Sequence, residues 1–305
     1  MSDRLNNPRP FQPSPNNLQL FLLTVGLVIG GLLVGTIPMI LLGIVDGEGA
    51  NPNASPQQMR IGVLLNHLLA FAIPCLIALS INMRKDWYAA IGLDLFPNTK
   101  TFFTVLLFAL AALPIVAFSI WVNLQFDLPD WAQTAEQNSA ELLGKVLDMD
   151  SPLDLLLAIL AAGVAAGVGE ELLFRGILQG KIFSRLNHHL AIWISAILFS
   201  AIHFELAGFL PRLLLGAILG YSYWWSRSLW IPILFHTLFN GSQVIATYIS
   251  GEYTPDTEAV DLPSPVLTIL SLIAVVMLGI FLERDMDNTP PSGAPLVEEE
   301  ALEQV

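Results

Sequence analysis

Apolar and polar residues occur along this chain in long blocks, not in residue-by-residue alternation. Apolar stretches, most of them near the roughly 20 residues that an α-helix needs to cross a bilayer, are separated by polar loops. The pattern predicts an all-α fold, a polytopic transmembrane helical bundle with about eight spans. The predicted spans are residues 18–45, 60–83, 101–124, 153–177, 190–204, 209–225, 229–249 and 266–282.

Polar segments divide the chain further. We expect residues 1–17 to form a disordered head, rich in Pro and Asn, and residues 285–305 to form a disordered acidic tail. Between them lie the N-terminal transmembrane helices 1 to 3 (18–125), an extracytoplasmic loop (126–152) and a helical core (153–284). The loop contains an amphipathic stretch, 140–147, that either lies on the outer membrane surface or is a plain connector.

Composition supports a membrane protein. Of the 305 residues, 54% are hydrophobic and only 13% are charged, and the mean hydropathy is +0.64, outside the usual range for a soluble domain. The formal charge of -13 lies largely in loops and in the acidic tail, so we interpret it as solvation and expect no nucleic-acid partner. The single cysteine, Cys75, lies in an apolar run and allows no intramolecular disulfide.

The distribution of basic residues predicts the orientation of the chain in the membrane. The head, the tail and the even-numbered loops hold most of them, and the odd-numbered loops hold few. By the positive-inside rule, both termini are therefore predicted to be cytoplasmic. The residues on the predicted cytoplasmic side are Arg4, Arg9, Arg84, Lys85, Lys100, Lys181, Arg185, Arg227 and Arg284, and those on the other side are Arg60, Lys145 and Arg212.

Several ionisable side chains interrupt the apolar spans. The fourth span holds Glu170, Glu171 and Arg175, the fifth His203, and the seventh His236. A charge at the centre of a bilayer costs on the order of 2.5 to 3.5 kcal/mol, so a group of ionisable side chains there is expected to serve a function. We favour a role in catalysis. Glu171 and Arg175 are spaced i, i+4 with the acid first, the favourable order for an ion pair.

Glu170 has no such partner in its own helix. It is rotated by about 100° from Glu171 and shares a face with small residues that let another helix approach, namely Gly163, Ala166 and Gly167. Its partners must come from other spans, which offer His203 and His236. Asn240 follows His236 at i+4, so both side chains project together.

These residue types fit peptide hydrolysis, which needs a base to deprotonate water and donors to hold the developing oxyanion. Glu170, aided by His203, is the candidate base. His236 and the Asn240 amide are the candidate donors.

The motifs EExxxR at 170–175, FxxxH at 199–203 and HxxxN at 236–240 occur in this order on separate apolar stretches. Together they resemble the CPBP family (CAAX protease and bacteriocin-processing, also called Abi), which includes the type II CAAX prenyl endopeptidases. The resemblance covers residues 153–250, about a third of the chain.

The resemblance implies an intramembrane endopeptidase, with 153–284 as its catalytic core, that cuts a membrane-associated or hydrophobic peptide. A bacterial inner or plasma membrane is its expected location. The residues that match the catalytic positions of the family are Glu170, His203, His236 and Asn240, with Glu171 and Arg175 in supporting roles.

Two forms of the chemistry stay open. The family was long described as metalloproteases, and Glu170, His203 and His236 offer the three protein ligands of a catalytic zinc site. The alternative is a metal-free water activated by the glutamate. The HExxH pattern of soluble zinc proteases is absent, and we favour the metal-free form.

Other interpretations of the same residues remain. Taken alone, Glu171 and Arg175 are interpreted as a structural ion pair. His67 and Asn66 in the second span are expected to be a packing pair. His188 and His189 are expected at the membrane interface. For the whole protein, the alternatives are a proton- or ion-coupled transporter and a catalytically inactive scaffold or bacteriocin-immunity protein. The substrate is open: in a bacterial protein, bacteriocin maturation, self-immunity and processing of a membrane regulator fit better than prenylated CAAX peptides.

One geometric expectation opposes convergence of the site. Counting 1.5 Å per residue from the predicted cytoplasmic ends places Glu170 and His236 roughly 10 Å deep and His203 nearer 20 Å. A tilted helix, or a fifth span that begins deeper than Leu190, would bring them level.

Overall fold

The structure is a computed structural model, and it describes residues 11, 13–14, 16–46, 49–51, 53–253 and 261–288. The predictions of a disordered head and a disordered tail concern residues that lie, for the most part, outside these ranges. Within them the chain is a helical bundle with one short β-hairpin, formed by β1 (Val45–Asp46) and β2 (Gly49–Ala50). The predicted all-α fold class is confirmed.

The helices match the predicted spans one by one. They are α1 (Asn17–Leu41); α2 (Pro56–His67), the π-helix η3 (Leu68–Ala72) and α3 (Ile73–Met83); α5 (Thr99–Asn123); α7 (Pro152–Ala158), the π-helix η5 (Ile159–Ala165), α8 (Ala166–Glu171) and the π-helix η6 (Leu172–Ile182); α9 (His188–Ala201); α10 (Phe209–Ser226); α11 (Trp230–Ser250); and α12 (Pro265–Asn288). Short connectors are the 3₁₀ turn η4 (Arg84–Asp86) and α4 (Trp87–Ala90), and a further helix, α6 (Asp130–Val146), lies between α5 and α7.

Local sequence signals set where several of these helices begin. Ser55 and Gln58 form a capping box at the start of α2, in which the side chain of each accepts from the backbone N–H of the other. Asn98, Ser151 and Asn187 cap α5, α7 and α9 by accepting backbone N–H groups of the first turn. The polar residues between apolar runs therefore start helices as well as separating them.

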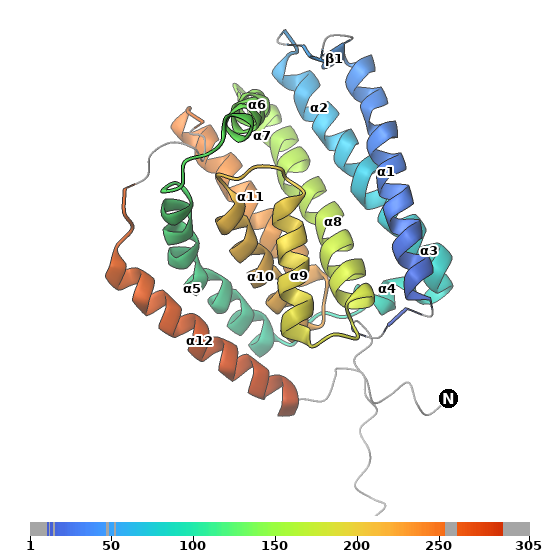
Figure 1. The fold of residues 1–305 in the computed structure, drawn as a ribbon, viewed down its shortest axis with the longest axis vertical. Coiled ribbons are helices and arrows are strands. Elements are labelled where there is room, and N and C mark those ends of the chain that lie inside the picture. The colour runs from blue at the N-terminus through green and yellow to red at the C-terminus, as the bar shows by residue number, and fades with distance from the viewer. Residues whose placement is uncertain are drawn as a thin grey trace, which may run out of the picture.

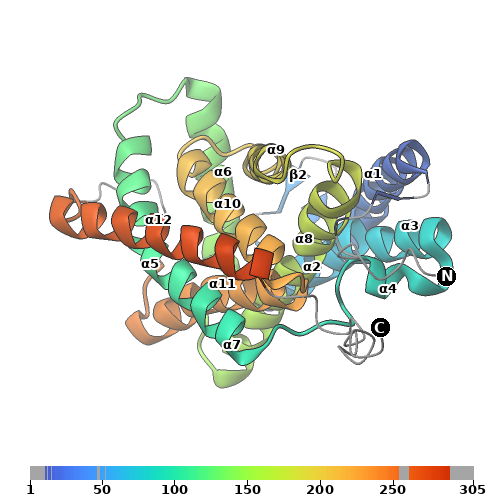
Figure 2. The same ribbon diagram turned by 90° about the horizontal axis from the view of Figure 1, so that it is seen from below.

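The bundle has two flanks and a centre. Figure 1 shows α1, α2 and α3 on one flank and α5 with α12 on the other, while α8 to α11 lie between them. Figure 2, seen from below, shows the same order, with α8 between the α1/α3 flank and α11. The segment α7 to η6 packs against α2 and η3 on one side and against α11 on the other. The fourth span is thus the central element of the fold.

The outer helices expose apolar side chains, as expected of a surface in contact with lipid. Leu33 on α1 is 68% exposed and Met277 on α12 is 66% exposed. Helices α1, α2–α3, α5, α7–η6 and α12 are each long and apolar enough to cross a membrane, and α9 is a shorter apolar helix. The chain is an integral membrane protein.

A buried arginine ties the N-terminal flank to the centre. Arg60 of α2 is 1% exposed; its Nε donates to the Val146 carbonyl (2.9 Å) and its guanidinium also reaches the Asp148 carbonyl. A third contact joins Arg60 Nη1 to Asp154 Oδ1 (2.5 Å). This arrangement fixes the connector between α6 and α7 against α2.

Candidate active site

Glu170 and Glu171 end α8, at the point where the fourth span changes from α-helical to π-helical hydrogen bonding. A π-helical segment widens the helix and redirects the side chains that follow, and such segments are frequent at functional sites. The second span makes the same change directly after His67, where η3 begins. Both segments lie side by side in the bundle.

Two glycines set how closely the neighbouring helices approach α8. A Cβ at Gly167 would lie 2.6 Å from Thr237 Oγ1 and 3.2 Å from Thr237 N, on α11. A Cβ at Gly169 would lie 2.9 Å from Phe71 Cβ, on η3. Small residues permit this backbone contact, as the sequence predicts for the face that carries Glu170. They hold Glu170 between the second span and the seventh.

The carboxylate of Glu170 is surrounded by imidazoles. His67 Nε2 lies 3.6 Å from Oε1, and His236 Nε2 lies 3.9 Å from Oε2. Glu170 also interacts electrostatically with His203. Glu170 is 6% exposed and His236 is 3% exposed, so their charges interact in a medium far less polar than water. The structure therefore places His236 within 4 Å of Glu170 and His203 within electrostatic range of it.

Glu171 has different partners. Its Oε1 accepts from Arg175 Nη1 (2.7 Å) and also lies 2.8 Å from His236 Nδ1. Arg175 donates in addition to the Gly216 carbonyl (2.8 Å), and its guanidinium lies 4.8 Å from the centroid of the Phe199 ring. The predicted i, i+4 pair is therefore present, and it also fixes the orientation of the His236 ring.

The hydrogen bonds of the histidine rings indicate which nitrogen faces Glu170. Nδ1 of His67 donates to the Val63 carbonyl (3.1 Å), and Nδ1 of His203 donates to the Phe199 carbonyl (2.8 Å). A carbonyl can only accept, so each Nδ1 carries the proton and each Nε2 has a free lone pair when the ring is neutral. In His236 the Glu171 carboxylate takes the place of the carbonyl.

His203 reaches the site from a turn and not from within a helix. Helix α9 ends at Ala201, and the Phe199 ring lies edge-on to both His203 (5.3 Å) and His236 (5.8 Å). The fourth span continues past residue 177 to Ile182, so the same count places Glu170 deeper than expected and nearer the level of His203. The predicted end at 177 was therefore wrong.

Asn240 lies beside the site without contacting its charged groups. Its Nδ2 donates to the Ala162 carbonyl on η5 (3.0 Å), which joins α11 to the fourth span. Among the described residues, no contact is recorded between Asn240 and Glu170, His203 or His236. The catalytic role predicted for Asn240 stays a prediction.

His67 is the site residue that the sequence did not reveal. We expected it to pack with Asn66, but Asn66 lies against Gly35 on α1 while the His67 ring faces Glu170. Its signal was the same as that of His203 and His236, a histidine within an apolar span. Glu170 lies about a hundred residues further along the sequence than His67, so the spacing of the two residues gives no indication of their contact.

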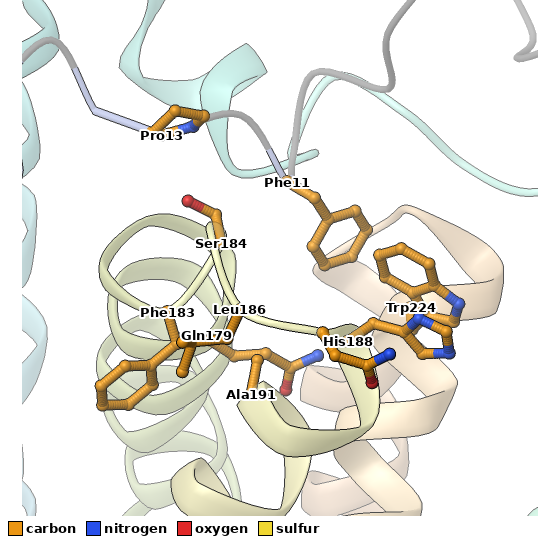
Figure 3. Close-up of a pocket in the computed structure, with 10 residues that line it drawn as sticks. Phe11, Pro13, Gln179, Phe183, Ser184, Leu186, His188, Ala191 and Trp224 are labelled. Carbon is orange, nitrogen blue, oxygen red and sulfur yellow. The ribbon is translucent and has the colours of Figure 1, made fainter.

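A separate cavity of about 400 Å³ lies at the end of the bundle where α9 begins. Figure 3 shows Phe11 close to Trp224 and His188, with Gln179 among the other residues that line the cavity. His188 stacks on Trp224 with ring centroids 4.4 Å apart, and its Nε2 lies 3.3 Å from Glu283 Oε1. None of the residues around Glu170 lines this cavity.

A catalytic zinc site needs three protein ligands that converge on one point. Among the described residues, no group of three or more His, Cys, Asp and Glu side chains is arranged to hold a metal ion. Glu170, His203 and His236, the ligand set that the resemblance offers for zinc, do not form such a group here. We therefore derive no step through a metal ion.

Comparison with known proteins bears on the same region. Residues 152–242 match the family described as "Type II CAAX prenyl endopeptidase Rce1-like". This confirms the predicted resemblance for that segment. A protein of Bacillus subtilis (strain 168) named "Putative membrane peptidase YdiL" is 27% identical over 100 residues, which are 33% of this chain and 40% of that protein. No solved structure matches the chain at a significant level.

The matched segment includes Glu170, Glu171, Arg175, His203 and His236. It leaves out α1 to α6, and with them His67. At the level of the family, the segment is similar to membrane peptidases.

Proposed function

We propose that this protein is an intramembrane endopeptidase in which Glu170 activates a water molecule to cut a peptide bond of a membrane-associated or hydrophobic peptide. The observation that carries the proposal is the position of Glu170, a buried carboxylate that faces imidazole nitrogens from other spans. The family match of the same segment supports it.

Glu170 acts as the general base. Its distances of 3.6 Å to His67 Nε2 and 3.9 Å to His236 Nε2 exceed a direct hydrogen bond, and we place the catalytic water beside these groups, where it can contact the carboxylate and an imidazole together. A water held there donates one proton to Glu170 and attacks the substrate carbonyl with its oxygen. Glu170 then returns the proton to the leaving amine.

The histidines position that water and hold the charge that develops. His236 is fixed by Glu171 and Arg175, so its Nε2 stays directed at Glu170 without further reorganisation. A protonated ring donates from Nε2 to the oxyanion, and a neutral ring accepts from the water. His203 and His236 both lie edge-on to the Phe199 ring, which links their positions.

His67 and Asn240 extend this assignment. His67 is the second imidazole within 4 Å of Glu170, and we assign it to orienting the carboxylate and the water. Asn240 remains the candidate for a second oxyanion donor, which requires its amide to leave the Ala162 carbonyl when substrate binds.

The test compares membranes from cells that produce wild-type protein and Glu170→Gln. Gln keeps the volume of the side chain but cannot act as a base. The rate at which peptides are released should therefore fall by at least about a hundredfold relative to the wild type. Glu141→Gln, the same change on the exposed face of α6, is the matched control and should leave release unchanged. Quantitative proteomics of the released peptides also identifies the substrate.

Release that persists in folded Glu170→Gln would contradict the proposal. Glu170-dependent proton flux in liposomes without any peptide cleavage would favour the transporter alternative. The metal content of the purified wild-type protein decides between the metal-free and the metal-dependent form of the chemistry.

A further inference from the structure

The turn that carries His203, residues 202–208, contains a strained backbone position. Phe204, the residue after His203, has φ +54°, in the left-handed region, and its side chain is 78% exposed. A large residue without glycine's freedom adopts this conformation only where its surroundings enforce it. The exposed Phe204 ring does not supply that constraint, so other groups must hold the turn.

Side chains from neighbouring helices supply it. Asn123, the last residue of α5, donates to the Leu206 carbonyl (2.7 Å) and accepts from Leu210 N (2.8 Å). Arg212 of α10 pairs with Glu205 Oε2 (2.6 Å) and donates to the Glu205 carbonyl (2.8 Å). The backbone of the turn is therefore bonded by groups from both adjacent helices.

The third anchor comes from α6, outside the predicted spans. Glu136 is 7% exposed, and its Oε1 accepts from Ala207 N at 2.7 Å. An ionised acceptor makes a stronger bond to a backbone N–H than a neutral one. Ala207 lies between the strained Phe204 and the start of α10, where the bond fixes the path of the chain.

We propose that Glu136 is a positioning residue for His203: through the Ala207 N–H, helix α6 holds the 202–208 turn in the conformation that directs the His203 ring toward Glu170. The effect on catalysis rests on the proposed function. The contact between Glu136 and Ala207 N is independent of that function. Residue 136 lies outside the segment 152–242, so this anchor belongs to the part of the chain that the family match leaves out.

The electrostatics of Glu136 provide a conservative variant. Burial raises the pKa of its carboxyl; the Ala207 hydrogen bond lowers that pKa, the nearby Glu205 raises it and Arg212 lowers it. Because burial already disfavours the charge, an amide of the same shape is tolerated there, and Gln keeps an oxygen that accepts from Ala207 N. Glu136→Gln should therefore keep the anchor, and Glu136→Ala should remove it.

Hydrogen exchange tests the contact without any substrate. The experiment uses the full-length protein in detergent micelles or nanodiscs. In Glu136→Ala, the amides of the peptide that covers 202–208 should exchange about ten to a hundred times faster than in the wild type, the loss expected for a bond to a charged acceptor. Glu136→Gln keeps a neutral acceptor for the Ala207 N–H, so its exchange should lie between that of the wild type and that of Glu136→Ala. Glu141→Ala, on the exposed face of the same helix, is the control for a lost carboxylate.

Kinetics test the positioning. With a peptide that the wild type releases and Glu170→Gln does not, Glu136→Ala should lower kcat about tenfold or more while KM changes less than twofold, because His203 and not the bound peptide is displaced. Glu136→Gln should restore kcat. A purely structural role would instead lower the unfolding temperature and leave kcat per folded molecule unchanged.

Two results would overturn the proposal: exchange in Glu136→Ala equal to that in Glu141→Ala, or faster exchange with wild-type kcat. If the wild type releases no Glu170-dependent peptide, the proposed function fails. The exchange measurement then still decides whether Glu136 holds the turn, and unchanged exchange rejects it.

Discussion

Glu170 and Glu171 are adjacent in the sequence, yet their surroundings differ in kind. Glu171 is fully buried and accepts from Arg175 and His236, so its charge is neutralised by fixed partners. Glu170 faces imidazoles at distances longer than direct hydrogen bonds. A paired carboxylate stabilises a structure, and a carboxylate without a fixed partner is free to accept a proton.

The Glu171–Arg175 pair gives a stability prediction. Arg175→Met leaves Glu171 buried without its cation, which should cost about 3–5 kcal/mol of unfolding free energy. Glu171→Gln/Arg175→Met removes both charges and should recover part of this loss. Unfolding in mixed micelles, followed by tryptophan fluorescence, measures both.

The exposed pair Lys100–Asp285 is the matched contrast, since the Lys100 side chain is 59% exposed. Lys100→Met should cost only about 0–1 kcal/mol. A cost for Arg175→Met as small as that for Lys100→Met would show that the buried pair is not stabilising.

Part of the site could be predicted at this scale. The spacing of Glu171 and Arg175 is a local rule, and the unpaired Glu170 followed from the same helix geometry. The bond from His236 to Glu171 and the approach of His67 depend on which helices are neighbours. No spacing in the sequence encodes that.

At the scale of elements, the apolar runs predicted the spans well because the length needed to cross a bilayer leaves little choice. The fourth span was predicted too short because polar residues such as Gln179 and Lys181 are typical of a loop. In the structure both are buried within the span, and Gln179 donates to the Gly220 carbonyl. The π-helical segments had no signal, because hydrogen bonding to i−5 leaves no distinct polarity pattern in so few residues.

The close contact between η3 and α8 gives a prediction at this scale. Gly169→Ala places a Cβ 2.9 Å from Phe71 Cβ, an atom fixed to its backbone, so the helices must separate. We expect a loss of about 1–3 kcal/mol in stability, together with lower Glu170-dependent cleavage as His67 moves away. Unfolding and peptide release on the same sample measure the two effects.

Gly26→Ala on α1 is the control, because a Cβ there meets nothing within 4 Å. It should be neutral or stabilise by up to about 1 kcal/mol through helix propensity. Equal effects of the two substitutions would mean that the contact between η3 and α8 is not tight.

At the scale of the whole molecule, α1 begins and α12 ends at the same end of the bundle (Figure 1). An even number of crossings agrees with this, and the basic residues predict that this end is cytoplasmic. Helices of the predicted N-terminal segment and of the predicted core pack into one bundle.

Cysteine labelling tests the orientation. In a Cys75→Ala background, Gln137→Cys on the exposed face of α6 should react with a membrane-impermeant maleimide in intact cells. Lys85→Cys, exposed at the opposite end, should react only after the membrane is permeabilised. The reverse pattern would place both termini outside.

The position of His67 has a consequence for how this bundle can be divided. The stretch that aligns with peptidases carries the acid and two of its imidazoles, while the remaining one arrives from a helix that such an alignment would discard as a variable extension. Grafting residues 152–242 onto another scaffold would therefore transfer an incomplete site. A natural relative with unrelated N-terminal helices needs a different side chain in the position that His67 occupies here.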